Sequence, residues 1–279
     1  MSGADPKKRP LVVVKVGGDV LLDERQRDGL GKNIKDLVDD GCQVVVLHGG
    51  GPQVTALQEK LGLVANKIAG RRVTTHADLV VVVQAICGEV NVGLVSALVA
   101  AGVRGFGCHG ASAQLVTAQK RPPMRVPGHE QPVDYGEVGD VVDVDAGLLR
   151  GLLGLHLVPV VATLGVDGGG RIFNINADTT AVQIAKALQA DLLLLVTAVG
   201  SVFRVLEDPS TRIASLTPAQ GKALIDDGTI AGGMIPKVEE ALSILNEGVG
   251  AVAIMGAQDA GAFRSALSGD GARGTRFSR

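Results

Sequence analysis

A few short segments of the chain combine glycines, cations and a carboxylate in a pattern suited to phosphate chemistry. Glycines occur at Gly17-Gly18 and Gly49-Gly-Gly51, and lysines at Lys15 and Lys237. Phosphoryl transfer needs fixed backbone N–H donors, cations over the moving charge and an acid that positions those cations, more than it needs a covalent nucleophile. The glycines supply the donors, the lysines supply the cations, and Asp178 is the natural organiser.

Each of these motifs also has an ordinary structural explanation. Lys15 ends an apolar run, so its amine would extend either toward the ligand edge of a parallel sheet or simply to solvent. The glycines before Pro52 suit an anion-binding helix N-terminus or a tight turn. If the segment from Asn174 to Asp178 is extended, residues 174, 176 and 178 share one face, and Asp178 would cap the following helix. Taken singly, the motifs leave both explanations open.

Short, continuous apolar runs indicate strands buried on both faces, and helical patterns separate these runs. The predicted strands are 11–16, 43–47, 158–162, 192–196 and 251–254. The predicted helices are roughly 25–39, 52–61, 76–101, 178–188, 218–227 and 236–247. This alternation predicts an α/β protein, a three-layer αβα sandwich around a mainly parallel, open twisted sheet.

The alternation stops between about residues 114 and 145, where prolines lie among alternating polar and apolar residues. Such a segment predicts a projecting hairpin, either a lid beside a ligand cleft or a plain surface excursion. We interpret residues 1–279 as a single domain with an N-terminal lobe over about 11–167 and a C-terminal lobe over about 171–279. The glycines at 168–170 mark the predicted seam.

Composition argues against several classes of protein. The net charge is −2 without a sustained basic run, and only 2% of residues are aromatic, so nucleic acid is not an expected partner. The N-terminal residues fit neither a signal peptide nor a transit peptide, and the longest apolar runs are strand-sized, which predicts a cytoplasmic protein without membrane contact. Cys42, Cys87 and Cys108 lack metal-ligand or disulfide spacing and are expected to be buried thiols.

One glycine pattern points to a different cofactor. Gly105-Phe-Gly-Cys-His-Gly110 matches the G-x-G-x-x-G signature of dinucleotide binding. However, the preceding strand is short, and a proline-rich segment follows where a long helix is needed. The chain also lacks a G-x-x-x-x-G-K-[ST] loop. Neither a nicotinamide site nor a P-loop fold is therefore predicted.

The motifs in order resemble the amino acid kinase family, and within it the kinases that act on N-acetyl-L-glutamate. The segments that carry the resemblance are Val14-Lys-Val-Gly-Gly18, His48-Gly-Gly-Gly-Pro-Gln53, Gly70-Arg-Arg-Val-Thr74, Asn174-Ile-Asn-Ala-Asp178 and Gly232-Gly-Met-Ile-Pro-Lys237. The resemblance runs from about Leu11 to Phe277. It implies that the N-terminal lobe binds the acyl substrate and the C-terminal lobe binds ATP. The implied reaction transfers the γ-phosphoryl group of MgATP to the side-chain carboxylate of N-acetyl-L-glutamate, the second step of arginine biosynthesis.

The resemblance also implies a role for each matched residue. Lys15 and Lys237 would flank the transferring group, Asp178 would hold both lysines, and the backbone N–H groups of Gly18 and Gly50 would bind its oxygens. The substrate would be held by Gly50, Gly51, Arg72 and Asn174. The nucleotide would be held by Val199, Gly200, Ser201, Val202, Phe203, Thr229, Ile230 and Ala231. Mg²⁺ would arrive with ATP, and no tightly bound cofactor or protein metal site is expected.

Some positions depart from the family pattern. Ala198 stands where the family usually has Asp in a nucleotide-contacting loop, His109-Gly-Ala-Ser-Ala113 replaces a charged segment near the lid, and Val92 replaces a lysine. Two alternatives therefore stay open: a kinase for another carboxylate, such as carrier-bound aminoadipate, and a non-catalytic sensor of acetylglutamate or nucleotide. The short segment before Leu11 and the composition of residues 261–279 differ from the arginine-inhibited hexamers of the family, and predict a homodimer.

Overall fold

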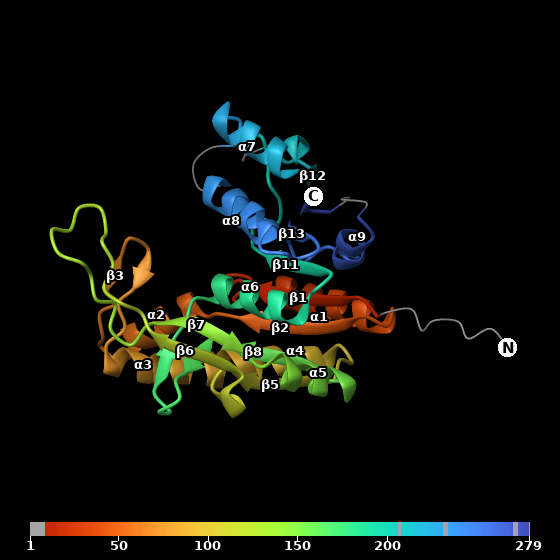
Figure 1. Cartoon of the computed structure of the whole chain (residues 1–279). Helices are drawn as coiled ribbons and strands as arrows, with labels where there is room; N and C mark the ends of the chain where they lie inside the picture. The colour runs from red at the N-terminus through yellow and green to blue at the C-terminus, as the bar shows by residue number, and fades with distance from the viewer. Residues whose placement is uncertain (1–8, 206–207, 231–233, 270–272, 279) are drawn as a thin grey trace.

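An eight-stranded sheet forms the centre of the molecule (Figure 1). The computed structural model describes residues 9–278 except 206–207, 231–233 and 270–272. The strand order is β12-β14-β13-β11-β1-β2-β8-β5, and the strands from β13 to β5 run parallel, while β14 is antiparallel to β13. The strands are β1 (Leu11–Val16), β2 (Gln43–His48), β5 (Gly105–His109), β8 (Val158–Ala162), β11 (Leu192–Val196), β12 (Ser215–Leu216), β13 (Val252–Met255) and β14 (Thr275–Phe277).

Helices cover both faces of this sheet, as the alternation of apolar side chains along β1 requires. Leu11 and Val13 pack into the core on one face, and Val12 and Val14 pack into the core on the other. The first core also contains residues of α5 (Ala146–Gly154), α6 (Ala177–Leu188) and α8 (Met234–Asn246). The second contains residues of α1 (Glu24–Asp39), α4 (Asn91–Ala100) and α9 (Ala262–Ser268). The predicted three-layer αβα sandwich is confirmed.

A second, smaller sheet stands beside one end of the first. Its order is β10-β9-β6-β7, with β6 (Val116–Lys120), β7 (Gly139–Val144), β9 (Leu164–Val166) and β10 (Ile172–Asn174). The chain enters it directly from β8 through Thr163. The glycines at 168–170, which the sequence assigned to the seam between lobes, form the turn between β9 and β10. The main sheet itself takes strands from both predicted lobes.

The proline-rich segment forms an antiparallel hairpin of β6 and β7 with a long excursion between them. Figure 1 draws this excursion as the yellow-green loop that extends beside β3 (Lys67–Ile68). The phenol of Tyr135 is buried there and donates to the Ile68 carbonyl at 3.3 Å. The backbone of Thr74, which follows β4 (Arg71–Arg72), also bonds to the excursion at Tyr135. The hairpin is therefore attached to the rim of the cleft described below, and its closure as a lid stays a prediction.

Most predicted elements lie within two residues of the observed ones, including α2 (Gly51–Lys60) and α7 (Pro218–Asp226). The expected helix at 76–101 is continuous, but its helical type changes along its length. It consists of α3 (His76–Val83), a π-helical segment (Gln84–Val90) and α4 in succession. Helices α5 and α9 were not predicted. The first two dinucleotide-like glycines, Gly105 and Gly107, belong to β5, and a Cβ on Gly107 would lie 2.4 Å from Asn91 Oδ1. This glycine therefore serves close packing against α4.

The stretch from His76 to Ala100 is long and apolar enough to cross a membrane by length and composition alone. Within its most apolar window, 44% of the residues are buried inside the protein. Its Leu94 and Leu98 pack in the core against the sheet. Part of this stretch is therefore a core helix of the fold, and a core helix can be as apolar as a membrane span.

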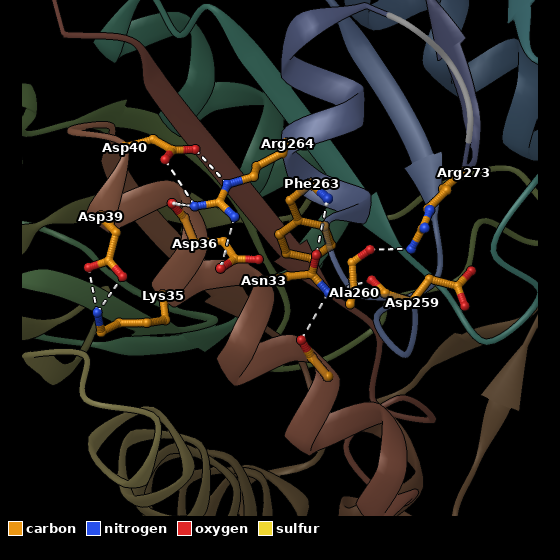
Figure 2. Close-up of polar contacts among 11 residues, drawn as sticks. Asn33, Lys35, Asp36, Asp39, Asp40, Asp259, Ala260, Phe263, Arg264 and Arg273 are labelled. Carbon is orange, nitrogen blue, oxygen red and sulfur yellow. Dashed lines mark hydrogen bonds and ion pairs between the residues drawn. The ribbon is translucent and has the colours of Figure 1, made fainter.

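A buried amide ties α1 to the segment that leads into α9 (Figure 2). Asn33 is 1% exposed, and its Nδ2 donates to the carbonyls of Gly29, Ala257 and Asp259, each at 2.9 Å. Its Oδ1 accepts from the backbone N–H of Phe263 at 3.2 Å. A Cβ on Gly29 would lie 2.3 Å from the Ala257 carbonyl oxygen, so the two segments approach as closely as glycine permits.

Asn33→Ala should lower the free energy of unfolding by about 3 kcal/mol, because it leaves several buried backbone groups without partners. Urea denaturation at pH 7 measures this loss. Lys35→Ala provides the control, since Lys35 forms only an exposed ion pair with Asp39 and its loss should cost under about 1 kcal/mol. Equal losses in the two variants would contradict this account of the Asn33 contacts.

Candidate functional site

A cleft of about 610 Å³ opens at the carboxyl ends of β1 and β2, beside the smaller sheet. Open α/β sheets bind ligands at this edge. The lining includes both glycine loops and five cations from several elements. Among the lining residues are Lys15, Gly17, Gly18, Gly49, Gly50, Gly51, Lys67, Arg71, Arg72, Arg121, Asn174, Asp178 and Glu240.

Lys15 reaches the cleft because of its position in β1. It has the parity of Leu11 and Val13, so its side chain leaves the sheet on the face covered by α6. There it forms an ion pair with Asp178 in the first turn of α6. The side chains are only 13% and 32% exposed, so the pair is less screened than a surface salt bridge.

The N-cap of α6 is Asn176, and this differs from the sequence expectation. The Asn176 side chain accepts from the Thr179 backbone N–H at 2.9 Å, and the helix starts at Ala177. The structural alternative, in which the segment stays extended to residue 178 and Asp178 caps the helix, does not occur. Because Asn176 satisfies the orphan donor, the Asp178 carboxylate is available to Lys15.

The two glycine loops pack directly on each other. A Cβ on Gly18 would lie 2.7 Å from Pro52 Cδ, and one on Gly50 would lie 2.9 Å from Ile86 Cγ2. Gln53 Nε2 also donates to the Gly18 carbonyl at 3.0 Å. Helix α2 begins at Gly51 without a side-chain cap on its N-terminus, and that end lines the cleft. Backbone N–H groups at such an end attract an anion.

His48 supports the second loop from behind. Its imidazole is fully buried, Nδ1 donates to the Gly49 carbonyl at 2.8 Å, and Nε2 lies 2.9 Å from Asn91 Nδ2. Since an amide nitrogen only donates, Nε2 is the acceptor and the ring is neutral. Burial lowers the pKa of His48 to about 4, although its bond to Gly49 opposes this shift. Asn91 Nδ2 also donates to the Val160 carbonyl at 2.9 Å, which links the loop to β8.

Arg72 and Asn174 meet the cleft from different elements. The Arg72 guanidinium donates to the Gly51 carbonyl at 3.1 Å and to Thr55 Oγ1 at 2.7 Å, so α2 orients it. Burial lowers the pKa of Arg72, and the charge of Asp78 counteracts this. Asn174 Nδ2 donates to Thr74 Oγ1 at 3.1 Å. The two predicted substrate residues therefore line one cavity.

Glu240 is a cleft residue that the sequence analysis missed. It lies on α8, one turn after Lys237, and lines the same cavity as Lys15 and Asp178. The pKa of Glu240 is raised to about 7, mainly by burial and secondly by the nearby charge of Asp178, while the charge of Lys15 opposes the shift. The only available signal was its spacing of three residues from Lys237, which places both on one helix face.

Of the remaining predicted residues that the structure describes, none lines this cleft. Lys237 is half-buried in the first turn of α8, and Val199 to Phe203 follow β11. The side chains of Val202 and Ile230 are fully buried in the core, so these two positions can offer a ligand only their backbone. Gly200 turns with φ +76°, and its N–H donates to Thr197 Oγ1 at 3.2 Å. Ala231, and the motif glycines Gly232 and Gly233 that follow it, lie outside the described residues.

Comparison with known proteins places the sequence in one family. Residues 10–256 match the Amino acid kinase family, and the chain belongs to this family. An acetylglutamate kinase of Anaeromyxobacter dehalogenans is 44% identical over 95% of this chain and 98% of its own length. An acetylglutamate kinase of Sorangium cellulosum is 43% identical over 95% of this chain and 93% of its own length. The solved structure of smu.665 from Streptococcus mutans superposes with a TM-score of 0.74 at 30% identity, over 96% and 98% of the two chains.

His48 should make folding sensitive to mild acid. Its folded-state pKa of about 4 lies below the ordinary value of 6.5, so the unfolded chain gains the proton first as the pH falls. Between pH 7 and pH 5 this should remove about 2 kcal/mol of stability. Urea denaturation of the protein and of His48→Asn at both pH values measures the difference. An equal pH dependence in the two proteins would contradict a buried neutral imidazole.

Proposed function

We propose that this protein phosphorylates N-acetyl-L-glutamate, using MgATP to convert the side-chain carboxylate into an acyl phosphate, as the second step of arginine biosynthesis. The observation that carries the proposal is the Lys15–Asp178 ion pair, which lines the same cleft as the two packed glycine loops. The names of the relatives at 43–44% identity support the choice of substrate.

The residues around this pair suit the reaction. The attacking group is already a carboxylate anion, so no general base is needed, and catalysis rests on position and on neutralising charge. Lys15 would stabilise the phosphoryl oxygens from one side and Lys237 from the other, with Asp178 keeping the Lys15 amine in place. The N–H groups of Gly18 and Gly50 would bind the oxygens where charge develops.

Substrate recognition would combine charge and shape. Arg72 would bind the α-carboxylate with its planar fork, and Asn174, Gly50 and Gly51 would bind the neighbouring polar groups. The cleft also includes apolar side chains, and these would receive the acetyl methyl group. They are Val54, Val82, Ile86, Val138 and Ile175.

The nucleotide would lie on the C-terminal side, along Val199 to Phe203 and Thr229 to Ala231. Family membership implies ATP as the phosphate donor. We propose that Mg²⁺ would enter with ATP and neutralise phosphate charge, and that no further cofactor is held. Ala198, which is exposed at this loop, favours a second candidate, a sensor that binds acetylglutamate or nucleotide without catalysis.

A cytoplasmic homodimer is the assembly that we propose. The long helix exposes Val80, Val92 and Val99, which are 46%, 64% and 59% exposed. Phe106, on the edge strand β5, is 41% exposed. Apolar side chains on a helix face and a neighbouring sheet edge are features of a surface that a second copy covers.

The kinase is tested by trapping the acyl phosphate as a hydroxamate. Purified protein with MgATP should form product with N-acetyl-L-glutamate, and not with glutamate or aminoadipate. Lys15→Ala should lower kcat by about 100-fold or more, because Lys15 neutralises charge that develops in the transition state. Lys186→Ala is the matched control. Lys186 lies on the same helix as Asp178, and the substitution removes only its exposed ion pair with Glu247.

No product from the unaltered protein, with acetylglutamate binding intact by calorimetry, would favour the sensor. Product formed with aminoadipate and not with N-acetyl-L-glutamate would show that the proposed substrate is wrong. Unchanged turnover in Lys15→Ala would overturn the proposed catalytic role of the ion pair.

Arg72→Lys should raise KM for acetylglutamate by about tenfold or more with a smaller effect on kcat, because a single ammonium cannot form the two parallel bonds of a guanidinium. Steady-state kinetics measures both constants. Arg104→Lys changes an exposed arginine that is absent from the cleft lining and donates to the Leu155 carbonyl, so it should leave KM near its original value. A KM effect of equal size in both variants would refute a specific carboxylate contact at Arg72.

A further inference from the structure

The carboxyl group of Glu240 lies in the cleft without a protein partner. Its side chain lines the cavity together with Lys15 and Asp178. Within the described part of the chain, no residue forms a hydrogen bond or an ion pair with it. Glu240 is half-buried, and an unpartnered carboxyl group in a cleft is a common point of contact with a ligand.

The charges around Glu240 do not favour its ionised form. Asp178, from α6, is a carboxylate that is itself paired with Lys15 of β1, so the positive charge of Lys15 is already shared. Lys237 precedes Glu240 by one turn on α8. Burial is the main reason that the pKa of Glu240 is raised to about 7, and the proximity of Asp178 is the second.

The other elements packed on α8 add little charge. Helix α7 carries Lys222 and Asp226, and both are exposed. Strand β14 carries Arg276, whose guanidinium donates to the Ala266 carbonyl at 3.0 Å. Strand β13 has no ionisable residue. The cations Arg72 and Arg121 line the cleft from β4 and from the end of β6.

We propose that Glu240 is a binding residue for the nucleotide phosphoryl group, acting as a neutral carboxylic acid whose O–H donates to a phosphoryl oxygen. The proposal rests on the proposed kinase function. An ionised Glu240 beside Asp178 would repel the incoming phosphoryl group, whereas the protonated group offers it a hydrogen-bond donor. Its position in the cleft near Lys15 and Asp178 assigns it to the phosphoryl end.

Proton uptake follows from this arrangement. An anion bound against Glu240 favours its neutral form, so the group takes a proton from solvent when the nucleotide binds and returns it when the product leaves. The transfer itself consumes no proton, because one carboxylate oxygen forms a bond to phosphorus while the bond to ADP breaks. The protein should therefore gain a fraction of one proton on binding nucleotide near pH 7.5.

The test is calorimetric titration of the protein with MgAMP-PNP at pH 7.5 in two buffers of different ionisation enthalpy. The dependence of the observed heat on the buffer gives the protons taken up, independently of turnover. Uptake should be present in the unaltered protein and absent from Glu240→Gln, which keeps a donor but cannot titrate. Glu239→Gln, on the exposed face of the same helix, should retain the uptake and controls for the charge change.

The pH profile gives a second readout. In the unaltered protein kcat/KM for MgATP should fall above about pH 7, approaching tenfold per pH unit, while Glu240→Gln stays flat and Glu240→Ala is weak throughout. Proton release on binding, or activity lost in Glu240→Gln at every pH, would show that the ionised form acts and would overturn the proposal. Equal uptake in the unaltered protein and Glu240→Gln would overturn it as well. Absence of acyl phosphate from the unaltered protein at pH 6.5 would instead refute the kinase, which separates the two failures.

Discussion

The ion pair between Lys15 and Asp178 is the constraint around which the site is built. It joins the end of the central strand β1 to the first turn of α6, and both groups are partly withdrawn from water. Neither charge could stay there alone, because an uncompensated charge in a partly buried position is strongly unfavourable. The pair therefore fixes α6 against the sheet edge and simultaneously leaves a directed ammonium beside the cleft. A structural requirement and the chemistry of phosphoryl transfer are met by the same contact.

Around this pair, the cleft is lined largely by the backbone of glycine residues. Gly18 and Gly50 approach other atoms so closely that a Cβ would not fit, which brings the two glycine loops together at the cleft. The neutral imidazole of His48 holds the second turn through the Gly49 carbonyl, and Asn91 links that imidazole to β8. A rigid backbone site of this kind needs little rearrangement when charge develops on a ligand, which is the basis of electrostatic preorganisation.

Charge in the cleft is unequally distributed between its two ends. The end formed by β3, β4 and β6 carries Lys67, Arg71, Arg72 and Arg121, as expected for a substrate that keeps its carboxylate. At the proposed phosphoryl end, Lys15 is paired with Asp178. Glu240 adds a carboxyl group whose pKa of about 7 lets nearby charges decide whether it is protonated. In the proposed reaction, different sides of one cavity would therefore recognise the fixed charge and control the moving charge.

The sequence by itself determined the five central strands of the main sheet, most helices and the glycine and lysine motifs, because these depend on local periodicity and on neighbours along the chain. The parity of β1 alone directs Lys15 to the α6 face. The tertiary structure decided that Asn176 caps α6 while Asp178 pairs with Lys15, since Asn and Asp both suit an N-cap and the sequence does not place Lys15 beside α6. It also decided that Glu240 lies near the charges of Asp178 and Lys15, and that Asn33 bonds to residues 224 to 230 positions away in the chain. No local pattern reports the burial and charge that such distant segments create together, and burial and charge are what set the chemistry of a site.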